Sequence, residues 1–216
     1  MSNDKYSSLA ALKTAEVRHR TYRIFTRNQR APLTLISPHG GFIEPGTSAV
    51  AHAVAGSVHN LFDFQGLQRG NPQDLHVTST KFRDPDLDNL LRHSTAALSI
   101  HGMHDQGVRA IWLGGLNQRF KHLMLHSLRT HDFPVDADSP RYRGTSPSNI
   151  VNQVRYQGVQ LEISNELFAD LFIGERFAEN ASGIQTTGRF AELTRALRQA
   201  IRSYLQETET RWSPER

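Results

Sequence analysis

The chain has 216 residues, 38% hydrophobic and 21% charged, with a formal net charge of +4, which is typical of one soluble folded domain and excludes a disordered chain. No apolar run reaches the roughly 20 residues of a membrane-spanning helix, and the first residues lack the charged and then apolar segments of a secretory signal. The absence of cysteine excludes disulfides, thiolate nucleophiles and cysteine-based zinc sites, so any metal ion must be held by histidine and carboxylate groups.

Hydrophobic periodicity and turn residues predict interleaved strands and helices. We expect residues 1–18 to form a loosely attached start, and 208–216 to form a flexible tail. Strands are predicted at 22–27, 33–37 (stopped by Pro38), 60–65, 74–79, 96–101, 109–113 and 158–164, and helices at 47–55, 84–93, 116–128 and 188–207, with a loop at 136–147. This order predicts a single catalytic domain over residues 1–216, an α/β fold of three layers with a mixed central sheet flanked by helices.

The most informative segment is His39-Gly-Gly-Phe-Ile-Glu44, which follows a predicted strand and precedes the helix at 47–55. Ligand sites in open α/β sheets lie beyond the carboxyl ends of strands, where this segment falls. Gly40 and Gly41 allow the sharp turn that lets the imidazole and the carboxylate converge on one point. Histidine and glutamate are normal zinc ligands. The alternative interpretation is a glycine-rich turn with an incidental histidine.

A second candidate, His101, lies at the end of the strand predicted at 96–101, on the face opposite its aliphatic residues. If it leaves the strand toward the same edge as His39, it supplies a third protein ligand. Two histidines and one glutamate, with water in the fourth position, form a known catalytic zinc shell. His104 and Asp105 compete for this place, and a chain with 11 histidines also offers accidental pairs.

The third candidate is Glu162, in the strand predicted at 158–164, where it projects from the face opposite Val159, Leu161 and Ile163. A lone carboxylate in an inner strand must be paired, hydrogen-bonded or reactive. The alternative is an edge strand with Glu162 in water.

Arginine supplies 21 of the 25 basic residues. Its guanidinium group forms a two-pronged contact with carboxylate and phosphate oxygens, so the composition favours an anionic partner. The alternative interpretation is a merely solubilising surface. That partner is either nucleic acid or a polymer of carboxylates. Aromatic residues make up only 8% of the chain, and it has no helix-turn-helix or zinc-finger spacing. A nucleic-acid-binding protein is therefore the remote alternative.

Four segments in this order resemble one family: Ser37-Pro-His-Gly-Gly-Phe-Ile-Glu-Pro-Gly-Thr47, Asp74-Leu-His-Val-Thr-Ser-Thr80, Ser99-Ile-His-Gly102 and Gly158-Val-Gln-Leu-Glu-Ile-Ser164. Over roughly residues 20–172 the chain is similar to the phage-type poly-γ-glutamate hydrolases, zinc peptidases with a carboxypeptidase-like fold. The resemblance implies a zinc ion (Zn2+) held by His39, Glu44 and His101, with Glu162 as the general base. It further implies cleavage of γ-glutamyl amide bonds in poly-γ-glutamate, cytoplasmic synthesis without a signal peptide, and release by phage-mediated lysis.

The substrate expected from the resemblance is a polyanionic glutamate polymer, which suits the surplus of arginine. His76, Arg143 and Arg155 are candidate substrate-binding residues, although His76 could equally be a structural histidine. The enzymatic alternative is a zinc amidase that acts on small N-acyl acidic amino acids. Such an amidase needs a small closed pocket, whereas a polymer needs an open cleft.

Overall fold

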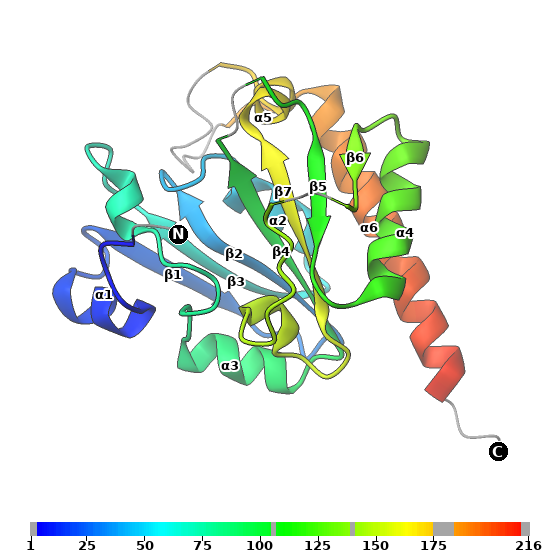
Figure 1. The fold of residues 1–216 in the computed structure, drawn as a ribbon, viewed down its shortest axis with the longest axis horizontal. Helices are drawn as coiled ribbons and strands as arrows, with labels where there is room; N and C mark the ends of the chain where they lie inside the picture. Colours follow the sequence, from blue (N-terminus) through cyan, green and yellow to red (C-terminus); the bar gives the residue numbers. More distant parts are fainter. Residues whose placement is uncertain (1–3, 105–106, 139–140, 175–183, 213–216) are drawn as a thin grey trace.

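The computed structural model describes residues 4–104, 107–138, 141–174 and 184–212 (Figure 1). Within these residues seven strands form one sheet in the order β1-β3-β2-β4-β7-β5-β6. The strands are β1 (Tyr22–Arg27), β2 (Leu33–Gly41), β3 (Asn60–Gly66), β4 (Ala96–Met103), β5 (Ile111–Gly114), β6 (Val135–Asp136) and β7 (Gly158–Ser164). The central strands β3, β2, β4 and β7 run parallel, whereas β1 and β5 each pair antiparallel with a neighbour. The predicted mixed sheet is confirmed.

Helices cover both faces of this sheet (Figure 1). One face carries α2 (Thr47–Ala55), α4 (Gln118–Thr130), α5 (Asn165–Leu171) and α6 (Gly188–Trp212), and the other carries α1 (Leu9–Ala15), α3 (Pro85–Arg92) and the short 3-10 turns η1 (Pro72–Leu75) and η2 (Ile150–Asn152). The apolar residues of the strands divide between two hydrophobic cores, so the predicted three layers are confirmed. None of the described helices has both the length and the apolar character needed to cross a membrane.

Side-chain alternation decides which core each strand residue enters. On β4, Leu98 and Ile100 face the core under α2 and α6, while Ala97 faces the core under α1 and α3. His101 therefore points to the α1 and α3 side, as its spacing from Ala97 predicts. The helix α3 begins where Asp84 caps it, because this carboxylate accepts from the backbone N–H groups of the first turn.

Two predicted strands differ from the structure. β2 does not stop at Pro38 but continues to Gly41, because its pairing with β3 shifts register between Ser37 and Gly40, and a proline without an N–H is tolerated at such an irregularity. The segment 74–79 is not a strand; it consists of the end of η1 and an extended stretch without a strand partner. β3 is paired with β1 on one side and with β2 on the other, so it has no free edge for this segment.

The two ends of the chain also differ from expectation. Leu9 and Leu12 are fully buried in the core beneath α1, so the described part of this segment, from residue 4, packs onto the domain and is not loosely attached. Residues 1–3 lie outside the described residues. At the other end α6 continues through Trp212, beyond the predicted start of a tail at residue 208. Residues 213–216 lie outside the described residues.

Candidate metal centre and its pocket

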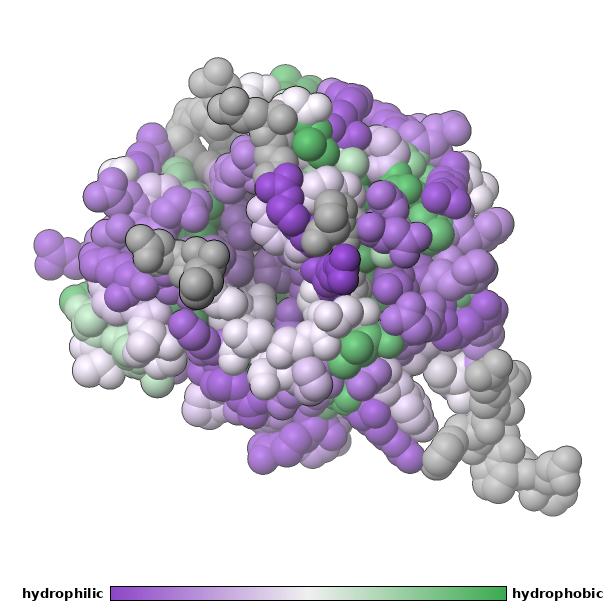
Figure 2. All heavy atoms as spheres, viewed as in Figure 1, coloured by the Kyte–Doolittle hydropathy of each residue, from purple (hydrophilic) through white to green (hydrophobic). Residues whose placement is uncertain are grey.

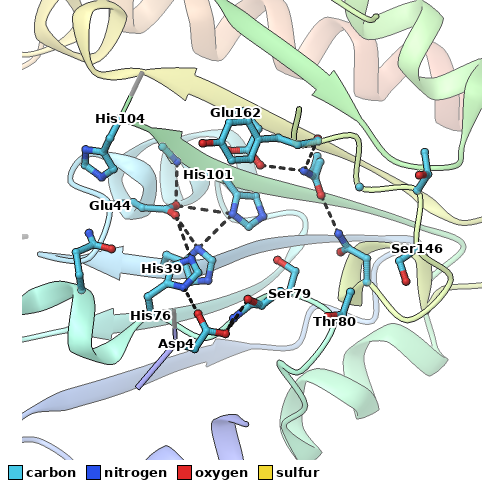
Figure 3. A pocket seen from close by; sticks show the side chains of 18 residues that line it. Asp4, His39, Glu44, His76, Ser79, Thr80, His101, His104, Ser146 and Glu162 are labelled. Carbon is cyan, nitrogen blue, oxygen red and sulfur yellow. Dashed lines mark hydrogen bonds and ion pairs between the residues drawn. The ribbon is translucent and has the colours of Figure 1, made fainter. Parts of the chain in front are cut away.

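The structure brings the three predicted ligands to one edge of the sheet. His39 lies near the end of β2, His101 near the end of β4, and Glu44 in the turn between β2 and α2 (Figure 3). One ligand atom from each residue lies within 4.8 Å of the other two, and all three side chains are buried. His39 Nδ1 is 2.8 Å from Glu44 Oε1 and 3.3 Å from His101 Nδ1.

Local backbone geometry explains why His39 and Glu44 converge. Gly41 has a φ of +68°, and a Cβ atom there would lie 2.2 Å from the carbonyl oxygen of Gly66, so only glycine fits. The Glu44 N–H then donates to the His39 carbonyl oxygen at 2.8 Å, which closes the turn. This part of the site is set by neighbouring residues of the chain, and the sequence therefore predicts it well.

The hydrogen bonds of His39 define which ring nitrogen can bind a cation. Nε2 lies 2.9 Å from the carbonyl oxygen of Val77, which can only accept, so Nε2 carries the proton. Nδ1 therefore carries the lone pair, and it faces a carboxylate oxygen of Glu44 and the Nδ1 atom of His101. Burial acts to lower the pKa of His39, but the charge of Glu44 and its hydrogen bond outweigh burial and raise it. A proton or a metal ion must therefore occupy the space between these groups.

The other two ligands have the protonation states that metal binding requires. Burial opposes ionisation of Glu44, but the charge of His39 and its hydrogen bond lower the pKa of Glu44 to about 2. Burial lowers the pKa of His101 to about 3, with the charge of Glu44 acting the other way. An ionised carboxylate and a neutral imidazole are the forms that bind metal ions. Two nitrogens and one oxygen are a donor set that fits zinc.

Glu162 stands beside this centre on the neighbouring strand. It is paired directly with His101 across β4 and β7, and directly paired residues project from the same face of a sheet. The side chain is 5% exposed, and β7 lies between β4 and β5, so the alternative of a solvated edge strand is wrong.

A directed chain of hydrogen bonds ends at the Glu162 carboxylate. The backbone N–H of Val151 donates to Asn149 Oδ1 at 3.1 Å, Asn149 Nδ2 donates to Gln160 Oε1 at 2.9 Å, and Gln160 Nε2 donates to Glu162 Oε1 at 2.9 Å. A backbone donor at one end and a carboxylate acceptor at the other fix the direction of every amide. Gln160 shares the face of Glu162 at a spacing of two residues, a signal that sequence analysis missed; no sequence pattern points to Asn149.

His76, predicted to bind substrate, lies at the pocket against His39, with ring centroids 4.1 Å apart and the ring planes tilted by 35°. Its Nε2 is 4.0 Å from Glu44 Oε1, and its Nδ1 is 2.8 Å from Asp4 Oδ1. The other oxygen of Asp4 accepts from the backbone N–H and the hydroxyl of Thr78 at 2.9 and 2.7 Å. Asp4 was missed because nothing near it in the sequence marks it as functional.

The remaining candidates lie outside the ligand group. Arg143 and Arg155 are exposed and are not among the residues that line the pocket; the guanidinium of Arg155 lies over the ring of Tyr156. His104 is exposed, and its Nδ1 is 2.8 Å from Asn165 Nδ2, so it lines the pocket without joining the ligands. Asp105 lies outside the described residues.

The ligands and Glu162 open into a cavity of about 820 Å³. Its walls are mostly hydroxyl, amide and imidazole groups, and the surface is hollowed there between hydrophilic residues (Figure 2). Besides the ligands and Glu162, the lining residues are Asp4, Gln73, His76, Thr78, Ser79, Thr80, Gly102, His104, Tyr142, Gly144, Thr145, Ser146, Asn149 and Gln160. The pocket is therefore polar, and it combines a metal-binding group with a carboxylate that can act as a base.

Comparison with known proteins agrees with this geometry. A family model described as poly-gamma-glutamate hydrolase matches residues 6–202. The SPbeta prophage-derived protein YoqZ of Bacillus subtilis (strain 168) is 31% identical over 175 residues, which are 80% of this chain. The matched part spans 63% of YoqZ, less than two thirds of that relative's length.

Two solved structures share the fold over most of their length. The structure of bacteriophage poly-gamma-glutamate hydrolase has a TM-score of 0.89 and 32% identity, and covers 94% of this chain and 99% of that one. YndL, a protein of Bacillus subtilis (strain 168), is known in a zinc-free apo form with a TM-score of 0.84 and 27% identity, covering 93% of this chain and 98% of that one. Because the family model spans nearly the whole chain, this protein belongs to the poly-gamma-glutamate hydrolase family.

Proposed function

We propose that this protein is a zinc-dependent hydrolase that cleaves the γ-glutamyl amide bonds of poly-γ-glutamate. The observation that carries the proposal is the convergence of His39, Glu44 and His101 within 4.8 Å, next to the buried carboxylate of Glu162. Membership of the family supports the substrate, and the zinc-free form of the related YndL supports the metal. When bound, zinc would supply Lewis acidity, which polarises a carbonyl group and lowers the pKa of water toward about 7.

Residues of the chain transfer the proton and hold the reacting groups in position. Glu162 takes a proton from the attacking water as its oxygen bonds to the amide carbon, and delivers that proton to the departing nitrogen as the carbon–nitrogen bond breaks. Gln160 donates to Glu162 Oε1, which stabilises the ionised carboxylate and holds its position. Val77 orients the ring of His39 through its carbonyl oxygen, as outer partners of histidine ligands commonly do.

The test begins with Glu162→Gln, which keeps the size of the side chain and removes its basicity. We expect zinc content to be retained and turnover of poly-γ-glutamate to fall by about two orders of magnitude or more, the scale of general-base removal. Glu207→Gln is the matched control, because Glu207 is only partly buried and pairs with Arg119 between α6 and α4, away from the pocket. Metal analysis and chain-length analysis of the products give the two readouts.

Further variants test the role of the metal ligands separately from the role of the base. His39→Ala and Glu44→Ala should lose both zinc and activity. Full activity of Glu162→Gln would refute its role as the base, and activity that survives complete chelation would refute the metal. Preferential cleavage of short N-acyl glutamates over the polymer would favour the small-substrate amidase.

A further inference from the structure

The catalytic pocket does not itself attract a polyanion. Among the described residues that line it there is no lysine or arginine, but there are three carboxylates, those of Asp4, Glu44 and Glu162. A divalent ion at the ligands would leave these three charges incompletely balanced. Poly-γ-glutamate carries one free carboxylate on every unit, so the charges that attract it must lie elsewhere on the protein.

A second cavity, of about 470 Å³, lies between α2 and α6 and is rich in arginine. Three arginines of α6 line it, Arg195, Arg198 and Arg202, together with carbon atoms of Ala53 and Phe190. Their spacing of three and four residues places them on one side of the helix. We call this cavity the basic groove.

The arginines of the basic groove are not neutralised by acidic neighbours. Arg195 and Arg202 are exposed, and no carboxylate of the described residues lies within ion-pair distance of either. Arg198 donates through Nη2 to the carbonyl oxygen of Ala53 at 2.5 Å and through Nε to that of Val54 at 3.3 Å, so the end of α2 holds it in place. Like charges on one helix side are unfavourable unless an anion compensates them.

Hydrogen-bond donors without a partner among the described residues also lie near the groove. Arg27, at the end of β1, has Nε and Nη2 buried with no hydrogen-bond partner in the described part of the chain, and the hydroxyl of Thr194 in the groove is likewise without one. Burial first, and then the charges of Arg198 and Arg27, lower the pKa of His59, so both guanidinium groups lie near that histidine. The positive region therefore extends from α6 to the end of β1.

We propose that the basic groove is a second binding site for poly-γ-glutamate, which anchors one part of the polymer while another part enters the catalytic pocket. This inference rests on the proposed function. Guanidinium groups bind carboxylates through paired hydrogen bonds, and the carbon surface of Phe190 suits the two main-chain methylene groups of each γ-linked unit.

The position of α2 fixes the separation of the two sites. This helix begins three residues after Glu44, at Thr47, and its last turn contacts Arg198. Nine residues at 1.5 Å each separate the sites by about 13 Å, and the path over the surface is longer. A γ-linked unit has five main-chain bonds, against three in an ordinary residue of about 3.5 Å, and so spans roughly 6 Å. When one of its amide bonds lies at the metal ligands, a three-unit oligomer extends by at most two units, roughly 12 Å, to either side. It is therefore too short to reach the groove over the surface, whereas a long polymer is not.

The experiment compares Arg195→Gln/Arg202→Gln with a control of equal charge, Arg92→Gln/Arg129→Gln, whose positions lie on α3 and α4 outside the groove. Arg198 is left unchanged because it holds the end of α2. Binding of long poly-γ-glutamate is measured in the Glu162→Gln background, and cleavage of the long polymer and of a three-unit oligomer is measured with the base intact. Thermal unfolding confirms that each variant is folded.

We expect the groove variant to bind the long polymer about tenfold more weakly at low salt, since joining two sites on one ligand can raise affinity by 10²–10⁴. KM for the polymer should rise and kcat should stay constant, cleavage of the oligomer should not change, and high salt should remove the difference. The control should behave as the wild type.

Equal polymer binding by the groove variant and the control would overturn the proposal. Tighter binding of duplex DNA than of poly-γ-glutamate through the same arginines would overturn it as well, in favour of a nucleic-acid site. Failure of the proposed function is a separate outcome: the wild type would not cleave the polymer, whatever the binding measurements give.

Discussion

Substitution of Asp4 tests how the segment before α1 contributes to the catalytic pocket. Its side chain is 3% exposed and accepts three hydrogen bonds, one from His76 and two from Thr78. Burial acts to raise the pKa of Asp4, but these hydrogen bonds and the charge of His76 lower it from 3.8 to about 2. Asp4→Ala removes all three bonds and leaves the donors of a pocket wall unpaired.

The magnitude follows from the pKa change. A decrease from 3.8 to about 2 corresponds to about 2 kcal/mol of stabilisation at neutral pH. Loss of hydrogen bonds to a charged group, at about 1.5–3 kcal/mol each and not additive, gives a similar figure. Because the pKa is lowered in the folded state, this stability is complete above the unfolded pKa and is lost as pH falls; by pH 3 about half of it remains.

Urea denaturation at pH 7 and pH 3, together with polymer cleavage by the zinc-loaded enzyme, measures these effects. We expect Asp4→Ala to unfold about 2 kcal/mol more easily at pH 7, with the deficit narrowing at pH 3. We also expect kcat/KM to fall about 10-fold or more, because His76 loses its orienting partner. Asp74→Asn is the matched control: it breaks the exposed ion pair of the same segment with Lys5 and should have little effect. Wild-type stability and activity of Asp4→Ala would refute the reasoning.

Two further predictions concern the metal centre and the base. Gln160→Leu should lower kcat about 10-fold or more with zinc content unchanged, because Glu162 loses the donor that holds it; exposed Gln153→Leu is the control, and unchanged kcat would contradict the prediction. Zinc binding near neutral pH should release protons, because the charge and hydrogen bond of Glu44 raise the pKa of His39, whose Nδ1 proton must leave when the metal binds. Calorimetry in buffers of different ionisation enthalpy measures this release, and its absence would contradict the assigned ligand atom.

Short-range features of this protein could be predicted from its sequence because they depend on neighbouring residues. Hydrophobic periodicity gave most strands and helices. The turn at Gly40 and Gly41 brings His39 and Glu44 together within six residues of chain. Alternation placed Glu162 on the face opposite its aliphatic neighbours, which the buried β7 confirms.

Long-range features were decided only by the tertiary structure. Whether Glu162 faces water or the metal ligands depends on the order of strands, which places β7 beside β4, and no local pattern encodes that order. Asp4 reaches His76 across 72 residues of chain because α1 packs into the core and carries the start of the chain with it. The arginine content predicted an anionic partner, but only folding put Arg195 and Arg202 beside α2 and kept Arg155 out of the pocket. Local conformation follows from adjacent side chains, whereas the meeting of distant residues depends on how the cores pack.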